Sequence, residues 1–156
     1  MKKKLTDILE ILMNFEHNFS NLYVSISEIE GQYSSSIKTV STVLASEEAK
    51  HYGYYKNLID TLQNNEDIEI TNEFYEKSSS LLAEFKEAVK LPSLANVKDL
   101  LKIAITFEND NVELLKCLIE ILSTELNGEE SDISLILKDI LLQEERHSRS
   151  LLQYIK

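Results

Sequence analysis

The sequence predicts an all-α fold, an antiparallel bundle of four long helices with a long crossover that contains an extra short helix between the second and third. One proline, Pro92, and three glycines interrupt the 156 residues, whereas sheet proteins need many more turn residues. Apolar residues recur at helical spacing in four long segments. At this length, residues 1–156 are expected to form a single domain with its own core.

The first two long helices are predicted over residues 4–29 and 35–62, and Gly31 with the serines that follow it marks the break between them. The apolar stripe of the first consists of Leu5, Leu9, Leu12, Phe19, Tyr23 and Ile26. The stripe of the second consists of Ile37, Val40, Leu44, Tyr55 and Leu58. A short link makes these two helices antiparallel neighbours.

The other two long helices are predicted over residues 97–126 and from Ser131 or Asp132, either of which is a good helix cap, to the C-terminus. Asn127-Gly128 is a good stop between them. The third helix is striped by Leu101, Ala104, Ile105, Val112, Leu115 and Ile119. The fourth is striped by Ile133, Ile136, Leu137, Ile140, Leu151 and Tyr154.

The link between the second and third long helices, residues 63–96, is long enough to cross the bundle. It begins with polar residues and continues as a shorter helix over about residues 72–90, ended by Leu91-Pro92-Ser93. A single long crossover between two antiparallel hairpins is one of the known four-helix topologies.

Composition narrows the classes of partner and the cellular compartment. The net charge of −11 would repel a phosphate backbone, so we expect no nucleic-acid partner. One cysteine, Cys117, excludes an internal disulfide and any site built from several cysteines. We expect Cys117 itself to be a small buried or half-buried side chain.

No segment of the sequence predicts a membrane span or a cleaved leader. Lys2, Lys3 and Lys4 give a basic start, but the residues that follow are acidic and amphipathic, and no small-residue cleavage site appears. No stretch is long and apolar enough to span a bilayer. We therefore expect a cytoplasmic protein.

Each long helix carries one glutamate on its apolar stripe. Glu16 lies between Leu12 and Phe19, and Glu108 lies between Ala104 and Val112. On the other two helices, each glutamate is followed three residues later by a histidine. These pairs are Glu48 with His51 and Glu144 with His147.

Converging buried carboxylates predict a metal centre. A buried unpaired carboxylate is costly, and four of them repel one another, whereas two divalent ions would offset four negative charges. Residues three apart share one helix face, so each Glu-x-x-His pair can serve one ion and Glu16 and Glu108 can bridge or chelate. Imidazole and carboxylate suit iron, manganese or zinc, and spacing does not choose among them.

The two halves of the chain repeat the pattern. Residues 11–16 (ILMNFE) correspond to residues 103–108 (IAITFE), and Glu48-Ala-Lys-His51 corresponds to Glu144-Glu-Arg-His147. Two metal-binding halves related by a pseudo-twofold axis would produce such a repeat.

Aromatic residues near the predicted ligands have two interpretations each. Tyr23 lies two turns after Glu16 on the same stripe, so it can be a hydrogen-bond donor to a ligand carboxylate or a core side chain. The cluster Tyr52-Gly53-Tyr54-Tyr55 can line the site or pack. His17 points about 100° away from Glu16 and is expected at the surface.

The ligand pattern Glu16, Glu48-x-x-His51, Glu108 and Glu144-x-x-His147 resembles the rubrerythrin branch of the ferritin-like superfamily. The resemblance covers essentially the whole chain outside the crossover. It implies a ferritin-like bundle with a non-haem di-iron centre that reacts with peroxide or dioxygen, as in proteins of oxidative-stress defence.

Two features depart from that family. Rubrerythrins carry a four-cysteine iron site, whereas this chain has only Cys117, so electrons would come from an external donor protein or a small reductant. Rubrerythrins also commonly have a further glutamate one turn after the third-helix ligand, where this chain has Asn111. The remaining set of four glutamates and two histidines is more similar to bacterioferritin and manganese catalase sites.

Three functions remain open at this point. The first is a dinuclear oxidoreductase of peroxidase or ferroxidase type, with the Glu-x-x-His pairs as terminal ligands. The second is an iron-binding protein that oxidises and sequesters iron without another substrate. The third is a metal-free or zinc-filled bundle that acts as an interaction module. The oligomeric state is also open, with a homodimer as the candidate.

Overall fold

A computed structural model describes residues 2–28, 33–65, 67–88, 96–125 and 131–153. These residues form the helices α1 (Leu5–Glu28), α2 (Ser35–Asn64), α3 (Asn72–Ala88), α4 (Val97–Glu125) and α5 (Asp132–Leu152). They also form two short strands, β1 (Lys3–Lys4) and β2 (Glu69–Ile70). The predicted all-α bundle with its crossover helix is confirmed. The predicted breaks at residues 31, 91–93 and 127–128, and Tyr154, lie outside the described residues.

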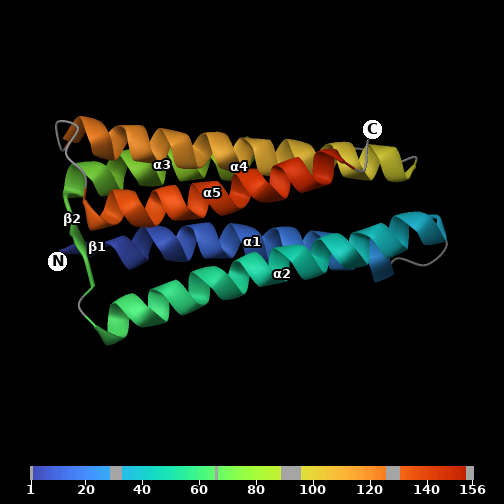
Figure 1. Cartoon of the computed structure of the whole chain (residues 1–156), viewed down its shortest axis with the longest axis horizontal. Helices are drawn as coiled ribbons and strands as arrows, with labels where there is room; N and C mark the ends of the chain where they lie inside the picture. Colours follow the sequence, from blue (N-terminus) through green and yellow to red (C-terminus); the bar gives the residue numbers. More distant parts are fainter. Residues whose placement is uncertain (1, 29–32, 66, 89–95, 126–130, 154–156) are drawn as a thin grey trace.

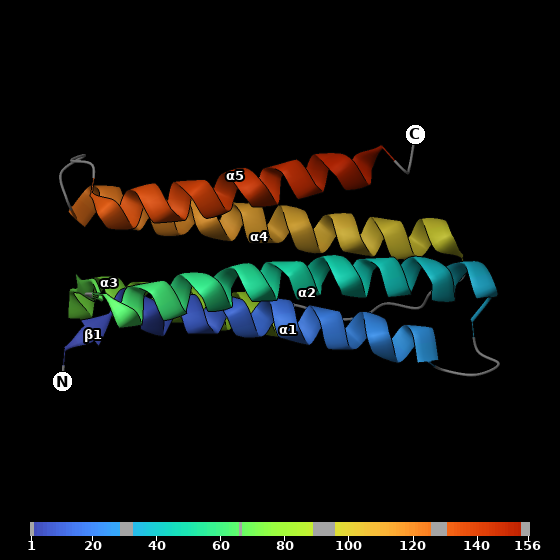
Figure 2. The same ribbon diagram turned by 60° about the horizontal axis from the view of Figure 1, so that its bottom comes forward.

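The helices form two antiparallel hairpins, α1 with α2 and α4 with α5 (Figure 1). Figure 2 shows the hairpins as two layers, with α5 and α4 above α2 and α1. α3 belongs to the crossover and packs against α4 and α1. None of the described helices is both long enough and apolar enough to cross a bilayer.

The core lies where the predicted stripes meet. On α4, Leu115 and Leu118 are fully buried, whereas Cys117 is exposed. The expectation that Cys117 is buried or half-buried was therefore wrong. Successive helical residues are about 100° apart, so a residue between two inward-facing positions is turned toward the outer surface of α4.

Two short strands, β1 before α1 and β2 in the crossover, carry no clear sequence signal. β1 and β2 pair antiparallel, with Lys3 opposite Ile70. The pairing continues through a hydrogen bond from the Leu5 amide to the Ile68 carbonyl at 2.8 Å. Two-residue strands are too short to show an alternating pattern, so the sequence did not predict them.

Side-chain caps fix the starts of α2 and α5. The Ser34 hydroxyl accepts a hydrogen bond from the Ile37 amide at 3.3 Å. The Ser131 hydroxyl accepts one from the Ser134 amide at 3.2 Å, and the Ser134 hydroxyl accepts one from the Ser131 amide at 2.9 Å. These bonds satisfy amides that the first helical turn leaves free.

Two leucines of α5 provide a test of the core assignment. Leu137 is fully buried, whereas Leu135 is 52% exposed. We expect Leu137→Ala to lower the free energy of unfolding by about 2–5 kcal/mol, because it leaves a cavity. Leu135→Ala should change it by no more than about 0.5 kcal/mol. Urea unfolding of the two variants measures both values, and equal losses would contradict the packing of α5.

Candidate metal centre

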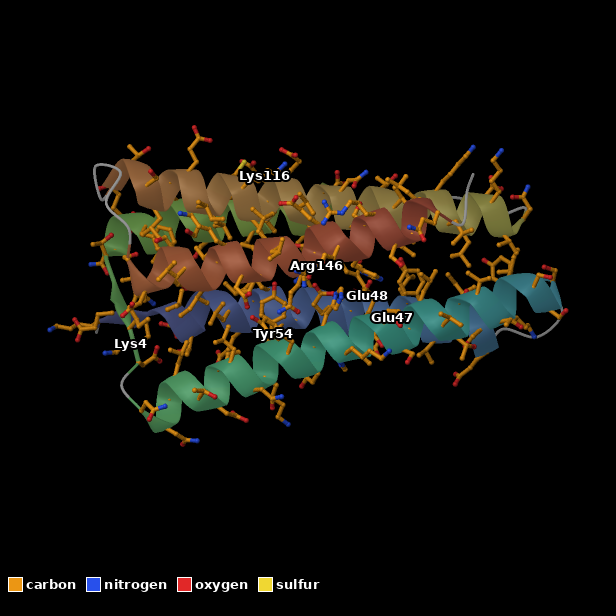
Figure 3. All side chains as sticks on the ribbon, in the orientation of Figure 1. Lys4, Glu47, Glu48, Tyr54, Lys116 and Arg146 are labelled. Carbon is orange, nitrogen blue, oxygen red and sulfur yellow. The ribbon has the colours of Figure 1, made fainter. Side chains whose placement is uncertain are left out.

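Four glutamates, one on each long helix, point into the core. The exposed fractions of Glu16, Glu48, Glu108 and Glu144 are 1%, 2%, 4% and 3%. They come from α1, α2, α4 and α5 respectively. In Figure 3, Glu48 lies about halfway along the bundle, between α2 and α5. Carboxylates this buried need partners, because isolated charges are strongly disfavoured inside a protein.

Helical periodicity explains why these glutamates are buried. Glu16 occupies a position of the α1 stripe between Leu12 and Phe19, which are 2% and 6% exposed. A residue four after one core position and three before the next must face the same side of the helix. The flanking apolar side chains therefore bury the carboxylate, although nothing in the glutamate itself favours burial.

The two histidines lie among these carboxylates. The Nδ1 atom of His51 is 3.4 Å from Glu144 Oε1 and 3.5 Å from Glu16 Oε2. The Nδ1 atom of His147 is 3.1 Å from Glu108 Oε2. The two imidazole rings meet edge to face, with centroids 4.6 Å apart. The structure thus brings all six predicted ligands into one cluster.

The donor atoms fall into two groups, in each of which they lie within 4.8 Å of one another. One group consists of Glu48, His51, Glu108 and His147, and the other of Glu16, His51 and Glu144. This grouping differs from the simple expectation that each Glu-x-x-His pair serves its own ion. His51 belongs to both groups because its ring reaches across the bundle to Glu16 and Glu144.

The pKa of Glu48 shifts in the opposite direction from the pKa values of Glu16 and Glu108. Burial raises the pKa of Glu16 well above its usual value, and repulsion from Glu144 raises it further. Burial and the charges of Glu48 and Glu144 likewise raise the pKa of Glu108. Burial would also raise the pKa of Glu48, but hydrogen bonding from Glu16 and Glu108 makes the net shift downward. The folded, metal-free protein therefore favours the protonated forms of Glu16 and Glu108 more than an unfolded chain does.

The surroundings of His147 favour its neutral form. Burial lowers the pKa of His147, and the neighbouring His51 lowers it further. A neutral imidazole has a free nitrogen lone pair, which is the form that binds a metal.

Several buried donor atoms of the cluster have no hydrogen-bond partner among the described residues. They are Glu48 Oε2, His51 Nδ1, Glu108 Oε2, Glu144 Oε2 and both ring nitrogens of His147. Buried polar atoms are normally satisfied, so this concentration requires an explanation. Carboxylate oxygens and imidazole nitrogens that converge without protein partners fit a pair of divalent ions.

Two buried tyrosines border the cluster. Tyr23 and Tyr55 are each 1% exposed. Burial raises the pKa of Tyr23, and the charges of Glu48 and Glu108 raise it further. The pKa of Tyr55 is raised by burial and by Glu144. The role of Tyr23 as a hydrogen-bond donor stays a prediction. Tyr55 was one of several candidates in its cluster, and only the fold distinguishes it.

The other two tyrosines of this segment, Tyr52 and Tyr54, make contacts with residues outside the predicted ligand set. The Tyr54 hydroxyl donates to Asp139 Oδ2 at 2.6 Å and links α2 to α5 (Figure 3). The ring of Tyr52 lies 5.4 Å from the ring of His17, centroid to centroid. His17 is exposed, as its position one residue after Glu16 predicted.

Comparison with known proteins supports the assignment of the fold. No family model matches the sequence, and no curated protein matches it significantly. A crystal structure from Thermotoga maritima, provisionally described as a ferritin-like diiron-carboxylate protein, matches with a TM-score of 0.54 and 24% sequence identity. The match covers 99% of this chain and 96% of that chain. The likeness establishes a ferritin-like fold for this chain.

Proposed function

We propose that this protein holds two metal ions, iron in the first place, and is a rubrerythrin-like oxidoreductase that reacts with peroxide or dioxygen. The observation that carries this proposal is the buried set of four carboxylates and two imidazoles, in which at least one donor atom of every residue except Glu16 has no hydrogen-bond partner among the described residues. Once ionised, the four carboxylates carry four negative charges, which two divalent ions offset. Manganese is the alternative metal, since the donor set suits both.

The cluster's own residues would position two bound ions. Glu48, Glu108 and His147 would hold one ion, and Glu16 and Glu144 would hold the other. His51 lies within reach of both groups. Two bound iron ions would supply two electrons to peroxide or dioxygen.

Apolar side chains around the cluster exclude bulk water. The rings of Phe19 and Phe107 stack with their centroids 4.9 Å apart, next to Glu16 and Glu108 along their helices. Tyr55 occupies the next turn of α2 after His51 and is fully buried. An environment without bulk water has a low dielectric constant, which strengthens the attraction between charged ligands and a cation.

Electrons to restore the reduced centre would come from outside the chain. His51 is the most open predicted ligand, with a side chain 17% exposed, and His147 follows at 9%. An external donor protein or a small reductant can therefore approach from the side of the histidines more closely than from the glutamates.

The first test measures metal content in protein purified without oxygen. We expect about two iron or manganese ions per chain by mass spectrometry. In the iron form, peroxide should bring out the near-ultraviolet absorption of an oxidised dinuclear centre. Catalytic peroxide consumption with a supplied reductant would support the oxidoreductase. Metal oxidation without turnover would instead indicate iron sequestration, and little metal after reconstitution would indicate an interaction module.

Two adjacent pairs on α2 provide matched variants. Glu48→Gln with His51→Gln removes two predicted ligands, and we expect it to lose metal and peroxide reactivity. Glu47→Gln with Lys50→Gln removes a surface ion pair at the same spacing, 3.1 Å between Nζ and Oε1. The control should retain both properties. A ligand variant that keeps metal and activity would rule out the proposed centre.

A further inference from the structure

Asn111 is a buried polar residue that the four-glutamate, two-histidine set does not include. It lies on α4, three residues after Glu108 and on the same face, and it is 4% exposed. Its side-chain amide donates a hydrogen bond to Glu16 Oε1, with 3.2 Å between the heavy atoms. This bond runs from a neutral side chain to a predicted metal ligand.

The bond breaks the symmetry between the two halves of the site. In the internal repeat, where Glu16 corresponds to Glu108, the position that corresponds to Asn111 is Phe19. Phe19 contributes only a ring, which stacks on Phe107. Glu16 is therefore held by a side-chain amide from the opposite hairpin, whereas the described position of α1 that corresponds to Asn111 has no side-chain amide to offer Glu108.

An amide at this position orients a carboxylate without adding charge. One oxygen of Glu16 accepts from Asn111, which leaves Oε2 directed toward His51 at 3.5 Å. Hydrogen bonds of this kind fix the orientation of metal-binding carboxylates, and their removal typically lowers metal affinity by about 10–100-fold. A carboxylate in the same place would repel Glu16 and would bring the donor set from four to five negative charges.

We propose that Asn111 is a positioning residue that holds Glu16 ready for metal and keeps the donor set balanced for two divalent ions, which favours the reduced state of the centre. This inference rests on the proposed function. It adds a claim about preference: a fifth negative charge would stabilise trivalent ions more than divalent ions, because the attraction grows with the charge of the ion.

The affinity test uses Co²⁺ alone as the probe, with binding followed by its visible absorption. Asn111→Leu keeps the branching and the number of heavy atoms of the side chain and removes the amide, and we expect Co²⁺ affinity to fall about 10–100-fold. Asn111→Ala replaces it if the leucine variant does not fold. Equal affinity of wild type and the folded variant would overturn the inference.

The redox test uses the iron-loaded protein at a fixed solution potential. Asn111→Asp should raise the ratio of oxidised to reduced centre about tenfold or more. Asn109→Asp is the charge-matched control, because Asn109 is exposed and its Oδ1 accepts from the Ser148 hydroxyl, a role that aspartate keeps. The control should leave the ratio unchanged. Equal shifts in both variants would overturn the inference, since a general surface charge would then explain them.

The outcomes separate this inference from the proposed function. If the wild type binds two Co²⁺ ions and the Asn111 variants behave like it, the role of Asn111 is wrong and the metal centre stands. If the wild type itself binds no Co²⁺, the proposed function fails and the inference fails with it. A purely structural role of Asn111 would change the melting temperature of the metal-free protein without changing the redox ratio.

Discussion

Glu108→Gln should weaken metal binding by at least about 100-fold, because loss of a direct ligand should exceed the effect of losing its outer hydrogen-bond partner. The same change should make the metal-free protein more stable. Burial and the charges of Glu48 and Glu144 raise the pKa of Glu108, so the folded protein without metal disfavours its ionised form. A neutral amide of nearly the same shape removes that cost, which is about 1.4 kcal/mol for each unit by which the pKa is raised, up to the working pH.

Opposite signs for metal affinity and stability are what identify a functional carboxylate. A residue that serves the fold is expected to lower stability when it is replaced, whereas a residue kept for a ligand is expected to raise it. Isothermal titration with Mn²⁺ measures the first quantity and urea unfolding of the metal-free protein measures the second. The combination needs no assumption about the reaction that the centre performs.

Glu113→Gln is the matched control on the same helix. The Glu113 side chain is 71% exposed and pairs with Lys116, with 3.5 Å between Oε1 and Nζ. Exposed ion pairs contribute little, so we expect both metal affinity and stability to stay close to those of the wild type. A destabilised Glu108→Gln protein that still binds two ions would mean that this carboxylate has a structural role.

The fold could be predicted from the sequence because its information is periodic. The stripes of α1 and α5, such as Leu5, Leu9 and Leu137, fix which face is buried, and link lengths fix which helices are neighbours. The β1–β2 pairing could not be predicted, because two residues show no period. Cys117 was misplaced because residue type was given more weight than its angular position between Leu115 and Leu118.

The candidate ligands could also be predicted from the sequence, but which of them lie next to one another could not. A glutamate on an apolar stripe stands out in one sequence, and the structure does gather Glu16, Glu48, Glu108 and Glu144. Which donor atoms lie together depends on how the two hairpins are shifted relative to each other, and no single helix encodes that packing. The same offset decides that Tyr55 borders the cluster and that Asn111 reaches Glu16.

Raising the pH should destabilise the metal-free protein through Glu16 and Glu108. Burial and neighbouring carboxylates raise the pKa of both in the folded state above the value of about 4.3 that glutamate has in an unfolded chain. Between the two values the folded protein holds protons that the unfolded chain has released. The free energy of unfolding must therefore fall as pH rises through that interval.

The measurement compares the pH dependence of urea unfolding in the wild type and in a Glu16→Gln, Glu108→Gln double variant. Burial lowers the pKa of His147, which adds an opposite slope below the ordinary histidine pKa of about 6.5. The difference between the two curves cancels that slope. We expect the wild type to lose stability relative to the variant as pH rises, and parallel curves would contradict the raised pKa values.

Bound metal should reverse the loss of stability with rising pH. This expectation connects the raised pKa values of the metal-free cluster to the proposed metal binding. A divalent ion binds the ionised carboxylates, so it must displace the protons held by Glu16 and Glu108. Zn²⁺ added to weakly buffered protein should therefore release protons, and its affinity should increase with pH. Proton release that persists in the double variant would assign the displaced protons to other groups. Its disappearance, counted per Zn²⁺ ion bound at saturating Zn²⁺, would mean that the displaced protons come from Glu16 and Glu108.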